Sequence, residues 1–289
     1  MLRIGVIGLG NMGRHHARHY QASPQADLVA VCDSDATRLS AYKNQAIYQD
    51  YHQMIQSELL DAVSIAVPSK YHKAVAVACL QANIAILIEK PIALTQEDAH
   101  AIINASIMYN TPVMTGHIER FNPALMALRS YIQDNAIIIQ SLHSMRFSPL
   151  PKQIKDMTVL EDLAIHDVDI MAYLTGAEPS EKYALGDLKT YATLLYKYDS
   201  IACSIQVSWA HPIRTRRLYM NADQVSAILD YSECSVRVIT QSDDRYLDVK
   251  QHDALGEEIR HFLTCIQSKT KFLSDGVTGM NALNAICLK

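Results

Sequence analysis

The sequence predicts a two-domain α/β protein: an open parallel sheet covered by helices, followed by an α+β domain with a largely antiparallel open sheet. Three observations support this. Apolar strands alternate with helical segments over residues 2–117. The first strand runs directly into a Gly-x-Gly-x-x-Gly turn that starts at Gly8. Residues 183–249 read as successive strands with no helix between them. Because strands that alternate with helices form parallel sheets, we expect domains at 1–117 and 118–289.

In the first domain predicted strands alternate with predicted helices, which requires a parallel sheet with both faces covered. Thr95 is a plausible N-cap, because Asp98 follows three residues later as in a short capping box. The predicted strands are 2–7, 28–32, 61–67, 84–88 and 113–115, and the predicted helices are 14–21, 70–81 and 96–108.

In the second domain the pattern changes to long strands. Apolar and polar residues alternate strictly from Ile201 to Trp209, as in a strand with one buried face. The other face of such a sheet also carries apolar residues, which favours a homodimer or homotetramer formed through this sheet. The predicted elements are helices 123–131, 158–174, 256–267 and 277–287, the strand 136–145, and the strands within 183–249.

Composition excludes several classes of protein. The chain has 289 residues, of which 49% are hydrophobic and 19% charged, with a net charge of -4 and no long block of one sign. These values are typical of a globular protein and argue against a nucleic-acid or membrane partner. The longest apolar run, 74–80, is too short to cross a bilayer. The N-terminus enters a strand at once and shows no secretory signal.

Cysteine and histidine usage points to a reduced, cytoplasmic protein without a metal site. The six cysteines show no Cys-x-x-Cys spacing, and several lie in apolar patterns, where a thiol behaves as a small hydrophobe. His15, His16 and His19 form the one histidine cluster. They fall on the first predicted helix, so we interpret them as helix-surface residues rather than metal ligands.

The glycine turn indicates a Rossmann dinucleotide-binding domain. In Gly8-Leu9-Gly10-Asn11-Met12-Gly13 the glycines allow a tight turn, close approach to a pyrophosphate, and close packing of the helix on the strand. The helix N-terminus then faces the phosphates. Asp33 ends the second strand twenty positions after Gly13, where it can accept hydrogen bonds from ribose hydroxyls. We therefore expect NAD, with Ser34 and Arg38 leaving NADP as the less favoured cofactor.

Two further groups of residues suggest chemistry. The apolar run Ile86-Leu87-Ile88 ends in Glu89-Lys90-Pro91, at the edge of the sheet where ligands bind in open α/β folds. Asp162 and His166 are four residues apart in a helical pattern, so they would share one face. A carboxylate beside an imidazole orients the ring and raises its basicity. Asp167 and Asp169 would point elsewhere on the helix.

These motifs together resemble the Gfo/Idh/MocA family of pyridine-nucleotide-dependent oxidoreductases, from Leu2 to about Ala285. The motifs are Gly8-x-Gly10-x-x-Gly13, Glu89-Lys90-Pro91 and Asp162-x-x-x-His166-Asp167. The resemblance implies that Lys90 hydrogen-bonds the reacting oxygen over the nicotinamide, and that the Lys90–Pro91 peptide is cis. It implies His166 as general acid/base and Asp162 as its partner and a substrate ligand. Pro68, Ser69 and His72 are similar to the family's turn beside the cofactor.

Two segments resemble a subgroup of the family that oxidises the 3-hydroxyl of UDP-N-acetylglucosamine. They are 116–123 and 209–217, with His211 at a position where that subgroup would have threonine. Arg214, Arg216 and Arg217 form the one dense basic group, and guanidinium forks suit diphosphate oxygens. Alternation would send Arg217 to the opposite face. Arg120 and Asn122 could contact substrate or only cap a helix.

The sequence leaves three rival interpretations open. The first is a dehydrogenase of a free cyclitol or monosaccharide, with the arginines in structural roles only. The second is an NAD-dependent glycosidase, in which oxidation is transient and no net reduced cofactor appears. The third is a non-catalytic NAD-binding regulatory protein of the same fold, against which the joint presence of Lys90, Asp162 and His166 argues.

Overall fold

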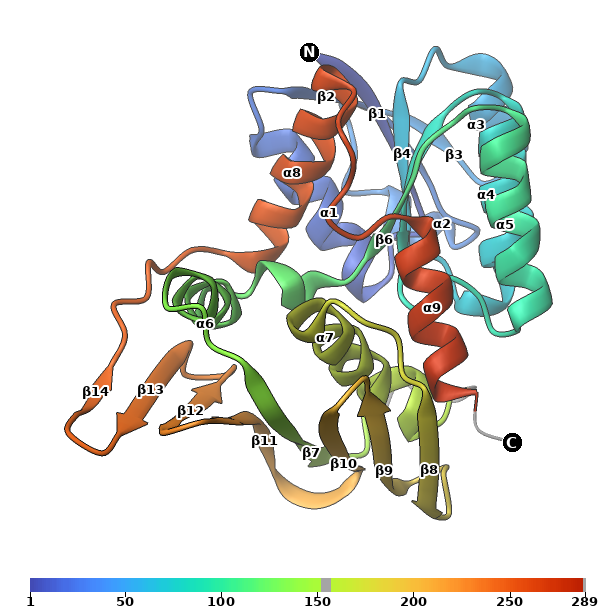
Figure 1. Cartoon of the computed structure of the whole chain (residues 1–289). Helices are drawn as coiled ribbons and strands as arrows, with labels where there is room; N and C mark the ends of the chain where they lie inside the picture. The colour runs from blue at the N-terminus through green and yellow to red at the C-terminus, as the bar shows by residue number, and fades with distance from the viewer. Residues whose placement is uncertain (152–156, 288–289) are drawn as a thin grey trace. The chain divides into compact units, whose positions relative to one another are not determined.

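The structure is a computed structural model that describes residues 1–151 and 157–287 (Figure 1). The chain forms two compact units. The first contains Met1–His117 and Leu255–Leu283, and the second contains Ile118–Ala254 and the chain from Asn284. Within the described ranges, the helices are all too short or too polar to cross a membrane.

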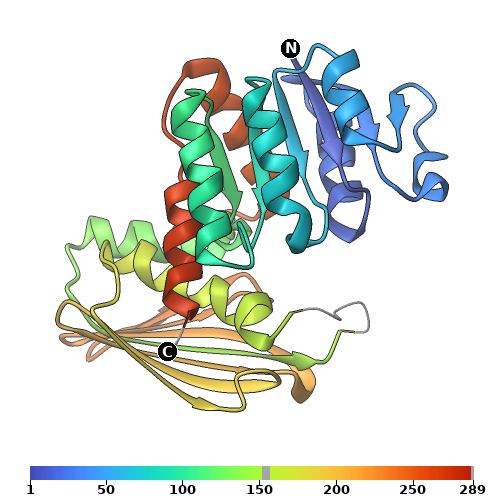
Figure 2. The ribbon, with the colours of Figure 1, turned by 90° about the vertical axis from the view of Figure 1, so that its right-hand side faces the viewer.

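The first unit is built on a six-stranded sheet in the order β3-β2-β1-β4-β5-β6, and every pair of neighbouring strands is parallel. Helices α1 and α8 lie on one face, while α3, α4 and α5 lie on the other (Figures 1 and 2). The strand order switches between β1 and β4: the strands up to β3 are added on one side of β1, and those from β4 on are added on the other side. Open α/β sheets bind ligands at such a switch point. The elements up to β6 are β1 (Leu2–Ile7), α1 (Asn11–Ala22), β2 (Ala26–Cys32), α2 (Ala36–Leu39), β3 (Ala46–Tyr48), α3 (Tyr51–Ser57), β4 (Ala62–Ile65), η1 (Ser69–Tyr71), α4 (His72–Gln81), β5 (Ala85–Glu89), α5 (Gln96–Met108) and β6 (Val113–Gly116).

The two closing helices, α8 (Ala254–Ser268) and α9 (Gly276–Ile286), lie mostly in the first unit, whereas the sequence placed them in a domain of 118–289. The segment before α9 extends the sheet, because the Thr115 amide donates to the Ser274 carbonyl (2.8 Å). A Cβ built on Gly279 would lie 2.3 Å from Thr115 Oγ1, so glycine is what allows α9 to approach β6. This long-range packing has no signal in local sequence pattern.

The second unit is an eight-stranded sheet in the order β14-β13-β12-β11-β7-β10-β9-β8. It is antiparallel except where β7 and β10 pair in parallel, and, among the described residues, its helices lie on one face while the other face is bare (Figure 2). The alternation predicted for 201–209 is confirmed, since Ile205 and Val207 are buried. The elements are η2 (Ile118–Phe121), α6 (Pro123–Asp134), β7 (Ile139–Pro149), η3 (Leu160–Ala164), α7 (Ile165–Thr175), β8 (Glu181–Gly186), β9 (Tyr191–Tyr198), β10 (Ile201–Ser208), β11 (Ala210–Ala222), β12 (Val225–Asp230), β13 (Ser235–Thr240) and β14 (Asp244–Tyr246).

Candidate functional site

The glycine turn of the first unit has the shape that a dinucleotide requires. Gly8 has φ +91°, and a Cβ built on Gly13 would lie 1.7 Å from the Gly8 carbonyl oxygen. A Cβ built on Gly10, by contrast, meets no heavy atom of the described residues within 4 Å. Gly10 is also the N-cap of α1, so open space lies beside a helix N-terminus whose first N–H groups are available to an anion. The loop therefore fits a pyrophosphate.

Asp33 lies directly after β2 and is buried. Its Oδ2 accepts a hydrogen bond from the Leu9 amide (2.6 Å), and its Oδ1 accepts one from the Asp35 amide (2.9 Å). These bonds fix the carboxylate beside the glycine turn. Arg38 pairs with Asp33 (3.3 Å) and with Asp35 (3.4 Å), so this guanidinium is already shared by two carboxylates. Ser34 is exposed.

The Lys90–Pro91 peptide is cis. The turn that begins at Pro68 leads into His72, which is buried, with Nδ1 2.9 Å from the Pro91 carbonyl oxygen and Nε2 3.0 Å from that of Val67. Burial lowers the pKa of His72 despite these two carbonyls. A neutral ring has one N–H and donates to one carbonyl at a time. His72 therefore links two loops, and its predicted contact with the cofactor stays a prediction.

His16 is buried against Glu89 and is not the helix-surface residue that the sequence suggested. Its Nε2 lies 2.9 Å from Glu89 Oε1, and its Nδ1 lies 3.0 Å from Ser64 Oγ. The face of α1 that carries His16 packs on the sheet together with Tyr20. Gly13 and Ala17 lie on the same buried face, so helical periodicity from Gly13 could have indicated its burial.

The helix predicted for 158–174 is not regular. Residues Leu160–Ala164 form the π-helical turn η3, and α7 begins only at Ile165. Asp162 lies in the π turn and accepts a hydrogen bond from Trp209 Nε1 (3.3 Å), while His166 lies in the first turn of α7. The four-residue spacing therefore does not carry the α-helical geometry that the sequence argument used. π turns are frequent at functional sites.

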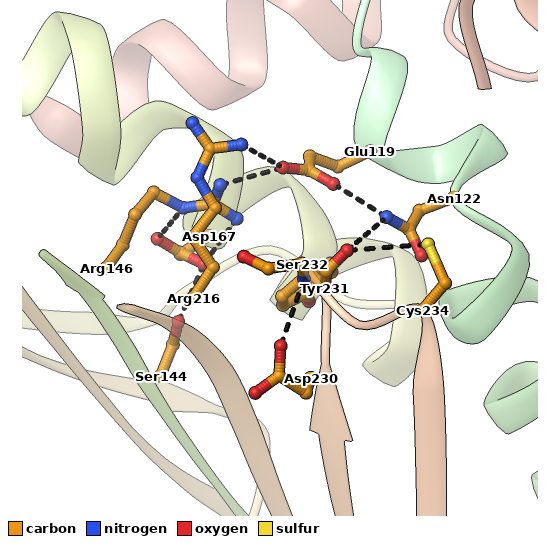
Figure 3. Close-up of polar contacts among 10 residues, drawn as sticks. All are labelled: Glu119, Asn122, Ser144, Arg146, Asp167, Arg216, Asp230, Tyr231, Ser232 and Cys234. Atoms are coloured by element: carbon orange, nitrogen blue, oxygen red, sulfur yellow. Dashed lines mark hydrogen bonds and ion pairs between the residues drawn. The ribbon is translucent and has the colours of Figure 1, made fainter. Parts of the chain in front are cut away.

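A buried charge cluster in the second unit was missed by the sequence (Figure 3). Arg146 is 1% exposed, and its Nε donates to Asp167 Oδ2 (2.9 Å) while its Nη1 donates to Glu119 Oε1 (2.7 Å). Asp167 also accepts from Ser144 Oγ (2.6 Å). Arg146 thus forms ion pairs with two buried carboxylates, and Asp167 is one of them. A lone arginine in a strand pattern gave no sign of these long-range partners.

Some of the predicted substrate residues form close hydrogen bonds or ion pairs within the protein, and others do not. Arg120 forms a two-pronged hydrogen-bonded ion pair with Asp169 (2.7 Å), and Asn122 caps α6 by accepting from the Ala124 amide (3.0 Å). Arg217 pairs with Asp230 (2.8 Å). Arg216 is 31% exposed and contacts Glu119 at 3.6 Å, and Arg214 is exposed and forms no ion pair within the described ranges.

Residues 2–117 match the sequence profile of the Gfo/Idh/MocA family, described as an oxidoreductase family with an NAD-binding Rossmann fold. The UDP-N-acetylglucosamine 3-dehydrogenase of Acidithiobacillus ferrooxidans is 32% identical over 98% of this chain and 95% of its own length. The chain belongs to the Gfo/Idh/MocA oxidoreductase family. A solved structure of the A. ferrooxidans protein GnnA superposes with a TM-score of 0.91 at 31% identity, covering 99% of this chain and 95% of that one. Myo-inositol 2-dehydrogenase of Thermotoga maritima is 29% identical over 65% of this chain and 59% of its own length.

This Gfo/Idh/MocA chain is therefore an oxidoreductase with an NAD-binding Rossmann fold, and its relatives include dehydrogenases of a sugar nucleotide and of a cyclitol. The fold and family predicted from the sequence are confirmed. Within the first unit, the structure gathers the glycine turn, Asp33 and the start of the Pro68 turn at the carboxyl ends of neighbouring strands. Within the second unit, Asp162 accepts a hydrogen bond from Trp209. Arg120 and Arg217 form ion pairs with Asp169 and Asp230.

Proposed function

We propose that this enzyme oxidises the 3-hydroxyl of UDP-N-acetylglucosamine, with NAD as the acceptor. The observation that carries the proposal is the pair Arg214 and Arg216, which is not fully neutralised, in a chain whose whole length matches a relative of that name. A free sugar or cyclitol carries no charge, so it has no use for two such arginines. A nucleotide diphosphate does, because guanidinium forks bind its oxygens.

The cross-strand position of Arg216 supports this role. Arg216 on β11 pairs directly with Arg146 on β7, and like charges placed opposite one another repel. Arg146 lies 2.7 Å from Glu119 Oε1 and also binds Asp167, whereas Arg216 lies 3.6 Å from the same Glu119 oxygen (Figure 3). Burial and the neighbouring Arg146 charge lower the pKa of Arg216. An incoming anion would relieve this repulsion.

The choice of NAD over NADP is supported by the charges around Asp33. Asp33 and Asp35 share Arg38, so the three side chains keep one net negative charge where a 2′-phosphate would bind. In NADP-binding proteins an arginine is free to accept that phosphate. We propose that the cofactor site is lined by Gly8, Gly10, Asn11, Met12, Gly13, Asp33, Ser34, Pro68, Ser69 and Glu89. Arg38 and His72 would support these residues from behind without contacting the cofactor.

We propose Lys90, His166 and Asp162 as the residues that carry the reaction. Oxidation removes a hydride and a proton from one secondary alcohol, and the nicotinamide supplies the hydride acceptor when bound. Lys90 would donate a hydrogen bond to the alcohol oxygen and stabilise its negative charge. His166 would take the hydroxyl proton as general base. Asp162, whose carboxylate is held by Trp209, would contact the substrate hydroxyls.

The test is turnover by the purified protein with NAD or NADP and a panel of alcohols. We expect reduced nicotinamide with NAD and UDP-N-acetylglucosamine, and much less with free N-acetylglucosamine or myo-inositol. Lys90→Met should lower kcat by about 100-fold or more, because the loss of one alkoxide-stabilising donor has effects of that size. Full activity of Lys90→Met would overturn the assignment.

A second candidate is a dehydrogenase of a free cyclitol, which the likeness to myo-inositol 2-dehydrogenase favours. In that case Arg216 only neutralises Glu119. Faster turnover of myo-inositol than of the sugar nucleotide, unaffected by Arg216→Met, would select it. For either substrate we propose a cytoplasmic homo-oligomer formed through the sheet of the second unit.

A further inference from the structure

Each neighbour of Lys90 in the chain is held by a buried histidine. Glu89, the last residue of β5, is bound through its side chain by His16 of α1 (2.9 Å). Pro91 is bound through its carbonyl oxygen by His72 of α4 (2.9 Å). Both histidines are 1% exposed. The Lys90 backbone is therefore fixed on both sides by groups that solvent does not reach.

His16 itself is part of a buried hydrogen-bonded chain. Its Nδ1 lies 3.0 Å from Ser64 Oγ, which lies 2.7 Å from the Tyr20 hydroxyl, and Ser64 and Tyr20 are fully buried. One assignment of hydrogens satisfies all four groups. Tyr20 donates to Ser64, Ser64 shares a hydrogen bond with His16 Nδ1, and His16 Nε2–H donates to Glu89. The ring is thus locked in the orientation that serves Glu89.

Glu89 depends on this donor. Burial by itself would raise the pKa of Glu89, but the hydrogen bond and charge of His16, with smaller effects of Lys90 and His72, bring it below its usual value. The carboxylate is also confined by packing, since a Cβ built on Gly116 would lie 3.4 Å from Glu89 Oε2. Without His16, this largely buried carboxylate, whose side chain is 12% exposed, would lose its donor and would have to take up a proton or move.

We propose that His16 is a positioning residue, which acts through Glu89 to hold the Lys90 ammonium where it meets the alcohol oxygen. This inference rests on the proposed catalytic role of Lys90. Its physical basis is preorganisation, because a catalytic group is effective only when the residues that support it are themselves fixed. His16 touches neither substrate nor cofactor in this role.

Two substitutions separate the hydrogen bond from the bulk of the ring. His16→Gln places an amide N–H near the position of Nε2 and keeps the donor to Glu89. His16→Asn places its amide near the position of Nδ1, and the shorter side chain does not reach Glu89. His100→Gln is the matched control, because His100 is exposed on α5. The measurements are kcat with UDP-N-acetylglucosamine, the Kd for NAD, and thermal stability.

We expect His16→Asn to lower kcat by about 10- to 100-fold, as small misplacements of catalytic groups do, with the Kd for NAD little changed. His16→Gln should restore most of the loss, and His100→Gln should have no effect. When Glu89→Gln is already present, His16→Asn should lower kcat little further, because His16 acts on Lys90 through Glu89. Labelling of Lys90 by acetic anhydride, followed by peptide mass spectrometry, reports its position without turnover, and its rate should change in His16→Asn but not in His16→Gln.

Wild-type kcat and an unchanged Lys90 labelling rate in His16→Asn would overturn the inference while leaving the proposed function intact. An equal loss of kcat and NAD affinity would also overturn it, because His16 would then serve the cofactor. If His16→Asn does not fold, the Glu89→Gln variant tests the inference instead. Wild-type activity of Glu89→Gln would then contradict it. Full activity of Lys90→Met would instead remove the proposed function, whatever the His16 variants show.

Discussion

The glycines of the cofactor turn show how far single residues can be understood from sequence. Their spacing predicts which chemistry they serve, and the structure adds why each is needed. Gly13 is required by close packing, since an added Cβ would overlap the Gly8 carbonyl oxygen at 1.7 Å. Gly10 faces open space and is required only if a ligand approaches there. The two positions should therefore respond differently to the same substitution.

Gly13→Ala should destabilise the folded protein by about 1–3 kcal/mol or more, because an overpacked methyl group forces the backbone to move. Gly10→Ala should leave the free energy of unfolding almost unchanged and weaken NAD binding by about tenfold, since its methyl group would occupy the path of the pyrophosphate. Chemical denaturation and calorimetric titration with NAD measure the two effects. Equal responses at the two positions would contradict this account of the turn.

Glu258 is a residue whose state no local pattern could predict. It is fully buried in α8, and its carboxyl has no hydrogen-bond partner among the described residues. Burial, and to a lesser degree the charge of Glu89, raise the pKa of Glu258 well above its ordinary value. The folded protein therefore favours the protonated form of Glu258 more strongly than the unfolded chain does.

Glu258 should make stability fall as pH rises. Below the ordinary carboxyl pKa, folded and unfolded chains both hold the proton. Above it only the unfolded chain releases the proton, which costs about 1.4 kcal/mol of stability per pH unit until the pKa in the folded state is reached. In urea denaturation, the stability of Glu258→Gln should not show this fall as pH rises above the ordinary carboxyl pKa. Exposed Glu233→Gln is the control, and parallel curves for wild type and Glu258→Gln would contradict the prediction.

At the scale of elements, the sequence predicted the bounds of a helix correctly where residues at its ends cap it. Helix α5 has the predicted bounds, and Thr95 caps it by accepting from the Asp98 amide (3.1 Å). The short α2, β3 and α3 were not predicted, because they are brief and rely on tertiary packing. The π turn at Leu160–Ala164 was also missed, since a single turn is too short for the apolar pattern to distinguish it from an α-helix.

The strands β7 and β11 carry a pair of arginines that should differ in role. Arg146→Met should cost about 3–5 kcal/mol of stability, because it leaves the buried carboxylates of Glu119 and Asp167 without their cation. Arg216→Met should change stability little and raise the KM for UDP-N-acetylglucosamine by about tenfold or more, since it removes a charge-assisted hydrogen bond to the diphosphate. Denaturation and steady-state kinetics measure both. A stable Arg146→Met, or an unchanged KM in Arg216→Met, would contradict these roles.

At the scale of the molecule, the sequence predicted two architectures and the change between them near His117, but not the return of the chain to the first unit. Leu255–Leu283 joins that unit through contacts such as Thr115 with Ser274, which are 159 residues apart. The bare face of the second sheet was predicted from alternation, and it carries Tyr183, Leu185, Tyr191 and Leu195, each at least 44% exposed. Exposed apolar patches of this kind are typical of subunit interfaces.

Tyr183 and Leu195 are cross-strand partners on β8 and β9, so together they mark this face. Replacing both by glutamate should shift the protein from an oligomer to a particle of 32.3 kDa, measured by light scattering after size-exclusion chromatography. Ile107→Glu, which adds the same charge at an exposed apolar residue of α5, should leave the oligomer unchanged. A wild-type protein that already runs as a monomer would contradict the proposed assembly.

The most direct test of the central claim follows one hydrogen. UDP-N-acetylglucosamine carrying deuterium at C3 is incubated with NAD and the wild-type protein, and both the cofactor and the sugar nucleotide are examined by mass spectrometry. We predict that the deuterium appears on the nicotinamide, that the sugar becomes a 3-ketone, and that Lys90→Met slows both by about 100-fold or more. Deuterium that stays at C3, with NAD unchanged under conditions in which the protein binds both molecules, would contradict the account.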